Sequence, residues 1–353
     1  MQGQRIGFCT APDGVRIAYA TSGGGPGRPL VRVATWLTHL EYDARVYAHW
    51  VAELGTGRTY LRYDLRGCGL SDRDVADLSL EAKVADLEAV INAAQVDQVD
   101  LLGVSGGGPV AIAYAHRHPH RVAHLVLYGS YARGRALRGV GSRQADEEAM
   151  FLSLTRAGWG GGHPAFRRVF TNLFMPDASE PEVDAYEEMQ ELSASADAAS
   201  AIRQTSYHTD VSAAAAELTV PTLVLHVRDD AVAPFEEGRR LAGLIPRAEF
   251  VPIEGRNHIL GPDDPAWFVF VAELRSFLAT AATPRERVLD RLTRRERDVL
   301  ERVAAGEDNE RIAAGLALSV RTVERHLSNI YLKLGVTGKS ARAAAAARFT
   351  RGT

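Results

Sequence analysis

Short apolar runs that alternate with helix-like stretches constrain the fold of this chain more than any other feature. Several runs are nearly continuous in Val, Ile and Leu, as in strands buried on both faces of a parallel sheet. Alternation of this kind predicts an α/β fold, a doubly wound, mostly parallel sheet with helices on both faces. The predicted strands are Val15–Ala20, Leu30–Trp36, Thr59–Tyr63, Val99–Val104, Ala123–Tyr128, Thr222–Val227 and Glu249–Ile253, and the predicted helices are Leu80–Ala94, Pro109–His118, Phe235–Leu244 and Ala266–Leu278.

The alternation is interrupted twice. The glycine-rich segment Thr21–Gly27 joins the first two runs and is predicted to be a turn, since it lacks the lysine and the spacing of a phosphate-binding loop. Between Tyr128 and Val220, about ninety residues carry helical patterns and no clear strand. In a doubly wound sheet such an insertion would lie over the carboxyl ends of the strands, where ligands bind. A helical cap at about residues 134–217, acting as a lid, is therefore expected.

The length of 353 residues exceeds what one hydrophobic core usually organises, so two domains are expected. From Thr280 to Leu292 the sequence is rich in Ala, Thr, Pro and Arg, which is typical of a linker. The predicted domains are an α/β domain at 1–280, a linker at 281–291 and an all-α domain at 292–353. The helices expected in the last domain are Arg294–Ala304, Glu310–Leu316, Val320–Leu334 and Ser340–Ala347.

Charge is distributed unevenly between these domains. Residues 291–353 contain 13 Lys and Arg against 7 Asp and Glu, whereas residues 1–290 contain 28 against 37. A small basic unit attached to a larger acidic one suggests that only the small unit meets a polyanion. Uneven composition without function would explain the same numbers equally well.

Several classes of protein are not indicated. The two cysteines, Cys9 and Cys68, make neither a disulfide framework nor a metal site by themselves. No histidine pair has the spacing of a metal motif, so neither a metal nor a cofactor is expected. The segment from Met1 to Tyr19 lacks the pattern of a secretory signal, and no run of about twenty apolar residues occurs. A cytoplasmic protein without a membrane partner is expected.

The C-terminal pattern predicts a helix-turn-helix. Thr293 and Glu296 have the spacing of a capping box, and Gly306 would end the helix that they begin. Ser319 is a second N-cap, and a short turn between two helices forms the DNA-binding arrangement. The second helix has an apolar face of Val323, Leu327, Ile330 and Leu334. Its other face presents Arg321, Arg325, Ser328, Asn329 and Lys333, which could contact phosphates and base edges.

The residue order in this region is more specific than its helical pattern. It runs Leu292-Thr293-Arg294-Arg295-Glu296, Val299-Leu300, Gly306, Asn309, Ile312-Ala313, Leu318 to Leu327, Ile330 and Lys333 to Val336. This order resembles the LuxR-type DNA-binding domain over about sixty residues. The alternative is a helical protein–protein module with a solvated basic face, but amphipathic helices alone would not produce this order.

The LuxR-type resemblance implies four helices, of which the third enters the major groove of double-stranded DNA and the fourth dimerises. A homodimer is therefore expected, as palindromic operators also imply. Many relatives have lysine at position 324, where this chain has Glu324, a carboxylate that could accept a hydrogen bond from cytosine N4. The resemblance implies that Glu324, Arg325 and Ser328 point toward bases, and that Asn309, Arg321, Thr322, His326 and Lys333 lie near phosphates.

Residues in the larger domain suggest a catalytic triad. Gly103–Gly107 reads Gly-Val-Ser-Gly-Gly between a predicted strand and helix, the context of a nucleophile elbow, in which Ser105 occupies a strained turn between glycines. Asp229 and Asp230 follow one later strand and His258 follows the next, which is the expected Ser–Asp–His order. His258 would take the serine proton, and the aspartate would hold the correct tautomer of the imidazole.

Residues 15–280 as a whole resemble the α/β-hydrolase family. Tyr63–Ser71 matches the family's loop after the third strand, with Cys68 in place of a more usual histidine, and Asp230 fits the catalytic acid because it stands four residues before Pro234. Relatives usually place His-Gly after the second strand to form half of the oxyanion hole, and the corresponding Thr35–His39 lacks that glycine. The expected oxyanion donors are the N–H groups of Gly106 and of Leu37 or Trp36.

Three functions follow from this combination. The first is a transcription regulator whose hydrolase-like domain senses a small ester, lactone or related metabolite beneath the cap. The second is an active serine hydrolase that also binds DNA, which the complete set of Ser105, Asp230 and His258 favours. The third is an enzyme whose C-terminal module serves only assembly. DNA binding by residues 285–353 would separate the first two from the third, and catalysis lost in Ser105→Ala would separate the second from the first.

Overall fold

The computed structural model describes residues 4–138, 142–159, 164–279, 292–334, 336, 338 and 341–350. The chain divides into two compact units, Met1–Leu278 and Ala279–Thr353, called here the larger and the smaller unit. Each unit has a hydrophobic core of its own, so each is described by itself. The predicted linker at 281–291 lies outside the described residues, as do residues 139–141 and 160–163 of the predicted cap.

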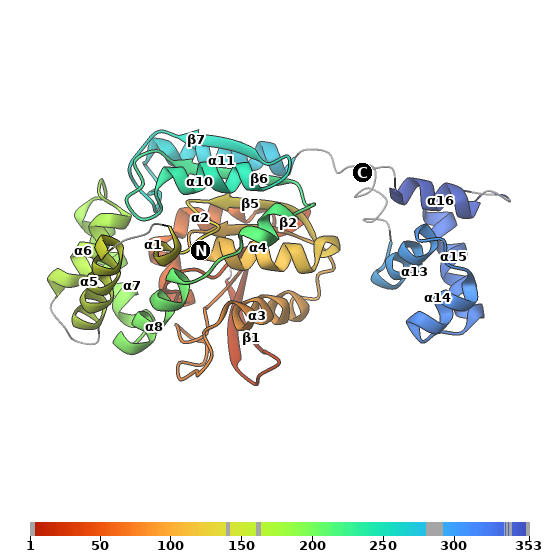
Figure 1. Ribbon diagram of the computed structural model, residues 1–353, viewed down its shortest axis with the longest axis horizontal. Coiled ribbons are helices and arrows are strands. Elements are labelled where there is room, and N and C mark those ends of the chain that lie inside the picture. Colours follow the sequence, from red (N-terminus) through yellow and green to blue (C-terminus); the bar gives the residue numbers. More distant parts are fainter. Residues whose placement is uncertain are drawn as a thin grey trace. The chain divides into compact units, whose positions relative to one another are not determined.

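The larger unit is built on one seven-stranded sheet (Figure 1). Its strands are β1 Arg5–Thr10, β2 Arg16–Val33, β3 Thr56–Tyr63, β4 Val99–Val104, β5 Val122–Tyr128, β6 Thr222–Val227 and β7 Glu249–Ile253. The pairs from β2 through β4, β5, β6 and β7 are parallel, whereas β1 and β3 pair antiparallel with β2. Every residue of β4, β5 and β6 is buried, as the continuous apolar runs predict. The expected α/β class with a mostly parallel sheet is confirmed.

The prediction of a turn at Thr21–Gly27 is wrong, because β2 continues through this segment. Tyr60 of β3 pairs with Ser22 in the first half of β2 and with Leu30 in the second half. Strand β3 therefore lies between the two halves, and the glycine-rich segment carries the chain from one side of it to the other. Gly25 has a φ of 138°, which residues with a Cβ rarely adopt. The glycines thus allow an extended crossover that keeps its pairing to β3.

Most predicted elements occur with ends that differ by a few residues, and β4, β6, β7 and α10 (Phe235–Leu244) have the predicted bounds. Strand β1 and the helices α1 (Leu40–Val46) and α2 (Ala48–Leu54) were not predicted. Each of these helices has seven residues, which is too short for a helical period to stand out from the sequence.

Helices cover both faces of the sheet. On one face, the ring of Trp50 in α2 lies with its centroid 5.0 Å from that of Phe270 in α11 (Pro265–Leu278), and Phe270 lies 5.1 Å from Tyr128 of β5. The preceding residue, Leu127, faces Gly108 of α4 on the opposite side, since successive side chains of a strand alternate. The helices on that side are α3 Leu80–Ala93, α4 Gly107–Arg117, α9 Ser212–Ala216 and α10, joined by contacts of α4 with α3 and α9 and of α9 with α10.

The insertion between β5 and β6 is helical, as predicted. Its main helices are α5 Ser142–Gly158, α6 Pro164–Phe174, α7 Glu180–Ser193 and α8 Ala196–Tyr207. Helix α5 packs on α6 and α8, α6 packs on α7, and α7 reaches α1. Figure 1 shows these helices, in yellow-green and green, grouped beyond one end of the sheet. They form a cap whose base is closed by a bridge between Arg133 and Asp210.

The smaller unit consists, in its described part, of the helices α13 Arg294–Ala304, α14 Asn309–Leu316, α15 Val320–Leu334 and α16 Ala341–Thr350. The predicted capping box is present, with the Thr293 N–H donating to Glu296 Oε2 at 2.7 Å. Gly306 follows α13 with a φ of 84°, as expected of a helix stop. The Ser319 hydroxyl accepts a hydrogen bond from the Thr322 N–H at 3.1 Å and so caps α15. The apolar faces of the helices meet in a core that includes Val299, Ile312, Val323, Ile330 and Ala345.

Candidate active site and DNA-binding surface

Ser105 lies in the tight turn between β4 and α4. Its φ of 50° is a left-handed value that is uncommon for a residue with a Cβ. The turn requires small neighbours, because a Cβ on Gly103 would lie 2.8 Å from Gly108 Cα and a Cβ on Gly107 would lie 2.9 Å from Val33 O. The Ser105 N–H donates to Tyr128 O at 2.9 Å. The sequence context of a nucleophile elbow thus corresponds to a strained strand-to-helix turn.

Asp230 and His258 meet in the loops that follow β6 and β7. His258 Nδ1 lies 2.6 Å from Asp230 Oδ2, and both side chains are buried. The other carboxylate oxygen of Asp230 accepts hydrogen bonds from the N–H groups of Val232 and Ala233, at 2.8 and 2.9 Å. Burial alone would raise the pKa of the Asp230 carboxyl, but the charge and hydrogen bond of His258 outweigh it and the pKa is lowered. Asp229 is exposed and makes no such contact, so the geometry selects Asp230.

The remaining ring nitrogen of the histidine, His258 Nε2, is buried and has no hydrogen-bond partner. Ser105 and His258 line the same small cavity beside the cap residue Phe174. The carbonyl of Phe174 accepts hydrogen bonds from the N–H groups of His258 and Ile259, at 2.9 and 3.0 Å. The cap therefore helps to hold the loop that carries the histidine.

Two residues that position this loop pair were not identified from the sequence. Gly129, with a φ of 55°, follows β5, and a Cβ there would lie 2.9 Å from His258 Cε1. His226 is fully buried, and its Nε2 lies 2.7 Å from Ala233 O beside the Asp230 loop. Neither residue belongs to a motif, since their roles depend on which loops come together in the folded chain.

Of the residues expected to donate to the oxyanion, Gly106 and Trp36 line the cavity beside Ser105 and Leu37 does not. Gly106 is the N-cap of α4, next to Ser105, and lines the cavity beside this serine together with Thr35 and Trp36. Leu37 does not line this cavity, and its side chain is 2% exposed within the core. Its φ of 26° shows that the backbone turns sharply at this point. Leu37 and Trp36 were the two candidates for the second oxyanion donor, and only Trp36 lies on the cavity wall.

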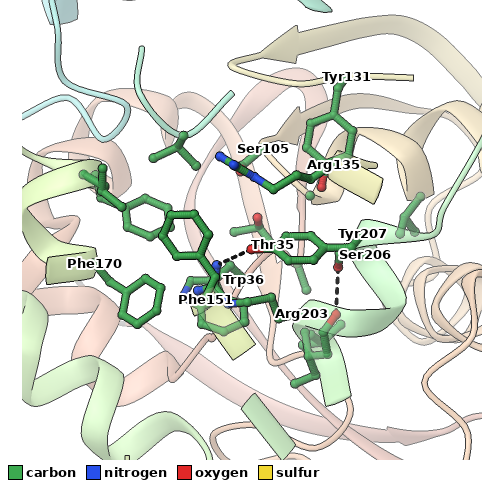
Figure 2. Close-up of a pocket in the computed structure, with 18 of the residues that line it drawn as sticks. Thr35, Trp36, Ser105, Tyr131, Arg135, Phe151, Phe170, Arg203, Ser206 and Tyr207 are labelled. Carbon is green, nitrogen blue, oxygen red and sulfur yellow. Dashed lines mark hydrogen bonds between the residues drawn. The ribbon is translucent and has the colours of Figure 1, made fainter. Parts of the chain in front are cut away.

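The cavity beside Ser105 lies between the sheet and the cap and has a volume of about 90 Å³. Figure 2 shows Ser105 and the side chains that surround it, from the sheet end and from cap helices α5, α6 and α8. Aromatic rings form much of the wall, with Trp36 from the sheet end and Phe151, Phe170 and Phe174 from the cap. Such a chamber beside a serine suits a small molecule with an apolar body and a polar reacting group.

Helix α15 presents the predicted base-reading residues to the solvent. Glu324, Arg325 and Ser328 are exposed, and the Ser328 hydroxyl donates to Glu324 O at 2.9 Å. Arg321 is exposed as well, and Thr322 and His326 are half-buried at the edge of the same surface. The opposite face, with Val323 and Leu327, is buried in the core of the smaller unit. Helix α15 is therefore polar on one face and packed in the core of the smaller unit on the other.

Two predicted phosphate contacts are engaged inside the smaller unit. Lys333 Nζ lies 2.6 Å from Glu296 Oε2, so its ammonium group already has a carboxylate partner. Asn309 Oδ1 accepts a hydrogen bond from Arg342 Nη1 at 2.7 Å, which connects the start of α14 to α16. A phosphate contact by either side chain would have to compete with these bonds. Neither partner could be predicted from a local pattern, because the two partners lie 37 and 33 positions away along the chain.

No cluster of His, Cys, Asp and Glu side chains that could hold a metal ion occurs among the described residues. In the same part of the chain, no helix combines the length and the apolar character needed to cross a membrane.

Comparisons with known proteins match the two units separately. The family described as "alpha/beta hydrolase fold" matches residues 28–265, and the family "Bacterial regulatory proteins, luxR family" matches residues 290–346. The AB hydrolase superfamily protein YisY of Bacillus subtilis is 29% identical over 244 residues, covering 66% of this chain and 86% of that protein. An esterase from Exiguobacterium antarcticum superposes with a TM-score of 0.66 at 24% identity, covering 77% and 99% of the two chains. The transcriptional regulatory protein YhcZ of Bacillus subtilis is 45% identical over 58 residues, covering 16% and 27%.

Proposed function

The chain belongs to the α/β-hydrolase fold family and ends in a LuxR-family DNA-binding domain, and we propose that it is a transcription regulator whose hydrolase unit senses a small ester, lactone or related metabolite. One observation carries the proposal. The same chain combines a helix with an exposed polar face, α15, and a partly enclosed cavity beside a buried Ser105. A DNA-binding domain fused to a hydrolase fold supports a regulator, because a protein that was only an enzyme would not need a DNA-binding domain.

The proposed DNA contacts come from α15. Arg325 and Glu324 would read base edges in the major groove, and Arg321 would contact the phosphate backbone. The exposure of these side chains supports the assignment. A homodimer would place two such helices on the two halves of a palindromic site, one helical turn apart.

DNA binding is tested by selection from a random double-stranded library with the full-length chain. The proposal expects enrichment of a palindromic sequence, and the mass of the protein on that duplex should correspond to two chains. The variant Arg325→Ala should lose the preference, whereas Arg239→Ala, on the exposed surface of α10 in the larger unit, should not. Recovery of DNA without any common sequence would contradict the proposal.

Ligand sensing would depend on the cavity between the sheet and the cap. A ligand there would contact both Ser105 on the sheet side and Phe170 on the cap side. It would therefore favour one position of the cap relative to the sheet. Such a preference is a coupling free energy, which typically changes the affinity at a second site by roughly 5–150-fold. The proposal therefore expects the ligand to change the affinity of the full chain for its DNA site.

A second candidate function is ester or lactone hydrolysis, favoured by the 2.6 Å contact between His258 Nδ1 and Asp230 Oδ2. In this candidate, Ser105 Oγ attacks the carbonyl carbon while His258 Nε2 takes the hydroxyl proton. The N–H groups of Gly106 and Trp36 would stabilise the oxyanion, and the alkoxide would leave with the proton from His258. Water would then attack the acyl-serine while His258 takes a proton from it, and His258 would return the proton to Ser105 Oγ as the acyl–serine bond breaks.

Intact-mass labelling with a fluorophosphonate distinguishes the two candidates without knowledge of the substrate. One adduct on the wild type and none on Ser105→Ala would favour a regulator that also hydrolyses its ligand. No adduct on folded protein would mean that the triad does not activate Ser105, and would leave a sensor without turnover. Labelling that persists in Ser105→Ala would contradict both assignments of the nucleophile.

A further inference from the structure

Among the described residues, the cavity beside Ser105 is lined by four basic side chains and no acidic one. Of its 21 lining residues, Lys83, Arg135, Arg138 and Arg203 are basic, and none is Asp or Glu. The basic groups come from α3, from the segment that leads into the cap, and from α8. A partly enclosed space with one sign of charge on its walls concentrates ligands of the opposite sign.

We propose that this cavity binds a carboxylic acid that also carries an ester or lactone, with Arg203 holding the carboxylate. The inference rests on the proposed function of the cavity as the ligand site and names the chemical class of the ligand. Arg203 is the anchor because, of these four basic groups, only its guanidinium has buried nitrogens without a hydrogen-bond partner.

Arg203 lies on α8 with its guanidinium carbon 3.9 Å from the centre of the Trp36 ring and 4.5 Å from that of Phe170. Its Nη1 donates to the Tyr207 hydroxyl at 3.2 Å. Its Nε and Nη2 are buried and have no hydrogen-bond partner. Figure 2 shows Arg203 among the side chains that surround the space beside Ser105.

Two unpaired guanidinium donors in a buried place are costly, since each has lost its water without gaining a partner. The two aromatic rings that flank Arg203 attract its charge but accept no conventional hydrogen bond from Nε and Nη2. A ligand carboxylate would satisfy both donors at once, because the Nε and Nη2 hydrogens form one side of the guanidinium fork and match two oxygens in a plane.

The other three basic groups add to the positive electrostatic potential in the cavity, and Arg203 remains the residue that holds the carboxylate. Arg138 lies 4.4 Å over the ring of Tyr131, and its Nε donates to Arg133 O at 2.9 Å. Arg135 lies 4.9 Å over Phe151. Burial lowers the pKa of Lys83 to about 8, so its ammonium remains mostly protonated near neutrality. The walls between these groups and Ser105 are aromatic, which suits an apolar spacer between the carboxylate and the ester carbonyl.

The test uses two probes, monobenzyl succinate and benzyl methyl succinate, which differ in the charge of one end and by the methyl group that removes it. Binding is measured by calorimetry to the full-length Ser105→Ala chain, so that neither probe can be hydrolysed through this serine. The acid should bind at least roughly tenfold more tightly than the neutral diester, as expected for charge-assisted hydrogen bonds. This comparison needs no change at Arg203 and therefore does not depend on the folding of a variant there.

The anchor is tested by Arg203→Gln and Arg203→Lys in the same background. Gln should remove most of the preference for the acid while leaving the diester affinity within about twofold, and Lys should restore part of it, because a point charge replaces the fork. The matched control Arg239→Gln, on the exposed face of α10, should change neither affinity.

The outcomes distinguish the carboxylate site from the cavity's role as a ligand site. Equal binding of the two probes, or a preference that survives Arg203→Gln, would overturn the carboxylate site while keeping the cavity as a ligand site. Failure of both probes to bind would overturn the proposed ligand site and the carboxylate site together. Preference for the acid, lost in Arg203→Gln and unaffected in Arg239→Gln, supports both.

Discussion

His258 Nδ1 lies 2.6 Å from Asp230 Oδ2, while Nε2 of the same ring is buried without a partner beside Ser105. The carboxylate thus occupies one ring nitrogen and fixes the tautomer in which Nδ1 carries the proton. The other nitrogen can then accept the proton of a serine hydroxyl. The loops after two neighbouring strands, β6 and β7, create this arrangement, and the glycine turn after β5 leaves room for the ring.

Replacing the catalytic acid should slow the labelling of Ser105. In Asp230→Asn the oriented carboxylate is lost, and we expect the rate of fluorophosphonate labelling to fall on the order of 10⁴-fold, as when the aspartate of a serine triad is changed to asparagine. The matched control is Asp229→Asn, whose exposed side chain stands one position earlier and should leave the rate unchanged. Equal rates in wild type and Asp230→Asn would show that the contact is structural only.

The base-reading role of Arg325 can be separated from phosphate contact. If Arg325 reads a guanine, Arg325→Ala should weaken binding to the selected site by about 1–3 kcal/mol and relax the preference at one base position. Arg321→Ala, on the same exposed face, should weaken binding to all sequences alike and reduce the dependence of affinity on salt. Binding to single-base variants of the selected duplex gives the answer. An equal loss on every variant for Arg325→Ala would reduce its role to phosphate contact.

The ion pair between Lys333 and Glu296 should stabilise the smaller unit. Glu296 is 3% exposed, and burial alone would raise the pKa of its carboxyl, but Lys333 and Thr293 outweigh this and the pKa is lowered. Lys333→Met would leave that carboxylate without its cation, at a cost of about 1–2 kcal/mol, because the lysine itself is partly exposed. Amide hydrogen exchange of α13 and α15 in the full chain should become faster, by roughly the corresponding 5–30-fold.

The control for this prediction is Lys339→Met, a change to the only other lysine of the smaller unit that leaves the Glu296 pair in place. Unchanged exchange in Lys333→Met would mean that Lys333 is free for phosphate contact at no cost to stability. Reduced DNA affinity together with unchanged exchange would then support the contact implied by the LuxR-type resemblance.

Asp64 should make the stability of the larger unit depend on pH. Burial raises the pKa of this carboxyl to about 7, despite hydrogen bonds from the N–H groups of Leu70 and Leu40. Between the pKa of an unfolded aspartate, about 4, and the folded value, the folded chain holds a proton that the unfolded chain has lost. The stabilising contribution is therefore fully present below about pH 4 and disappears as the pH rises toward 7.

Urea unfolding followed by tryptophan fluorescence measures this effect, because all four tryptophans lie in the larger unit. The unfolding midpoint should fall between pH 5 and pH 8 more steeply in the wild type than in Asp64→Asn. The exposed Asp74→Asn serves as the control and should keep the wild-type dependence. Identical pH dependence in wild type and Asp64→Asn would show that Asp64 is ionised throughout this range.

Local patterns in the sequence predicted most of the strands and helices, the turn that holds Ser105, and helix α15 with its cap. Each of these depends on neighbours close in the chain: the apolar period of α15, the glycines around Ser105, the Thr293–Glu296 spacing. Features that depend on residues far apart in the chain were visible only in the folded structure. It turned Thr21–Gly27 from a predicted turn into a paired crossover around β3, and it brought Asp230 rather than Asp229 to His258.

The same distinction applies to charge. From the sequence alone, a basic side chain that binds DNA cannot be distinguished from one that binds an acidic partner or a ligand. Packing placed Lys333 against Glu296, left Arg325 in solvent, and enclosed Arg203 between Trp36 and Phe170. These partners lie tens to more than a hundred positions apart, and their encounter depends on how helices and loops pack in space rather than on any local preference of the chain.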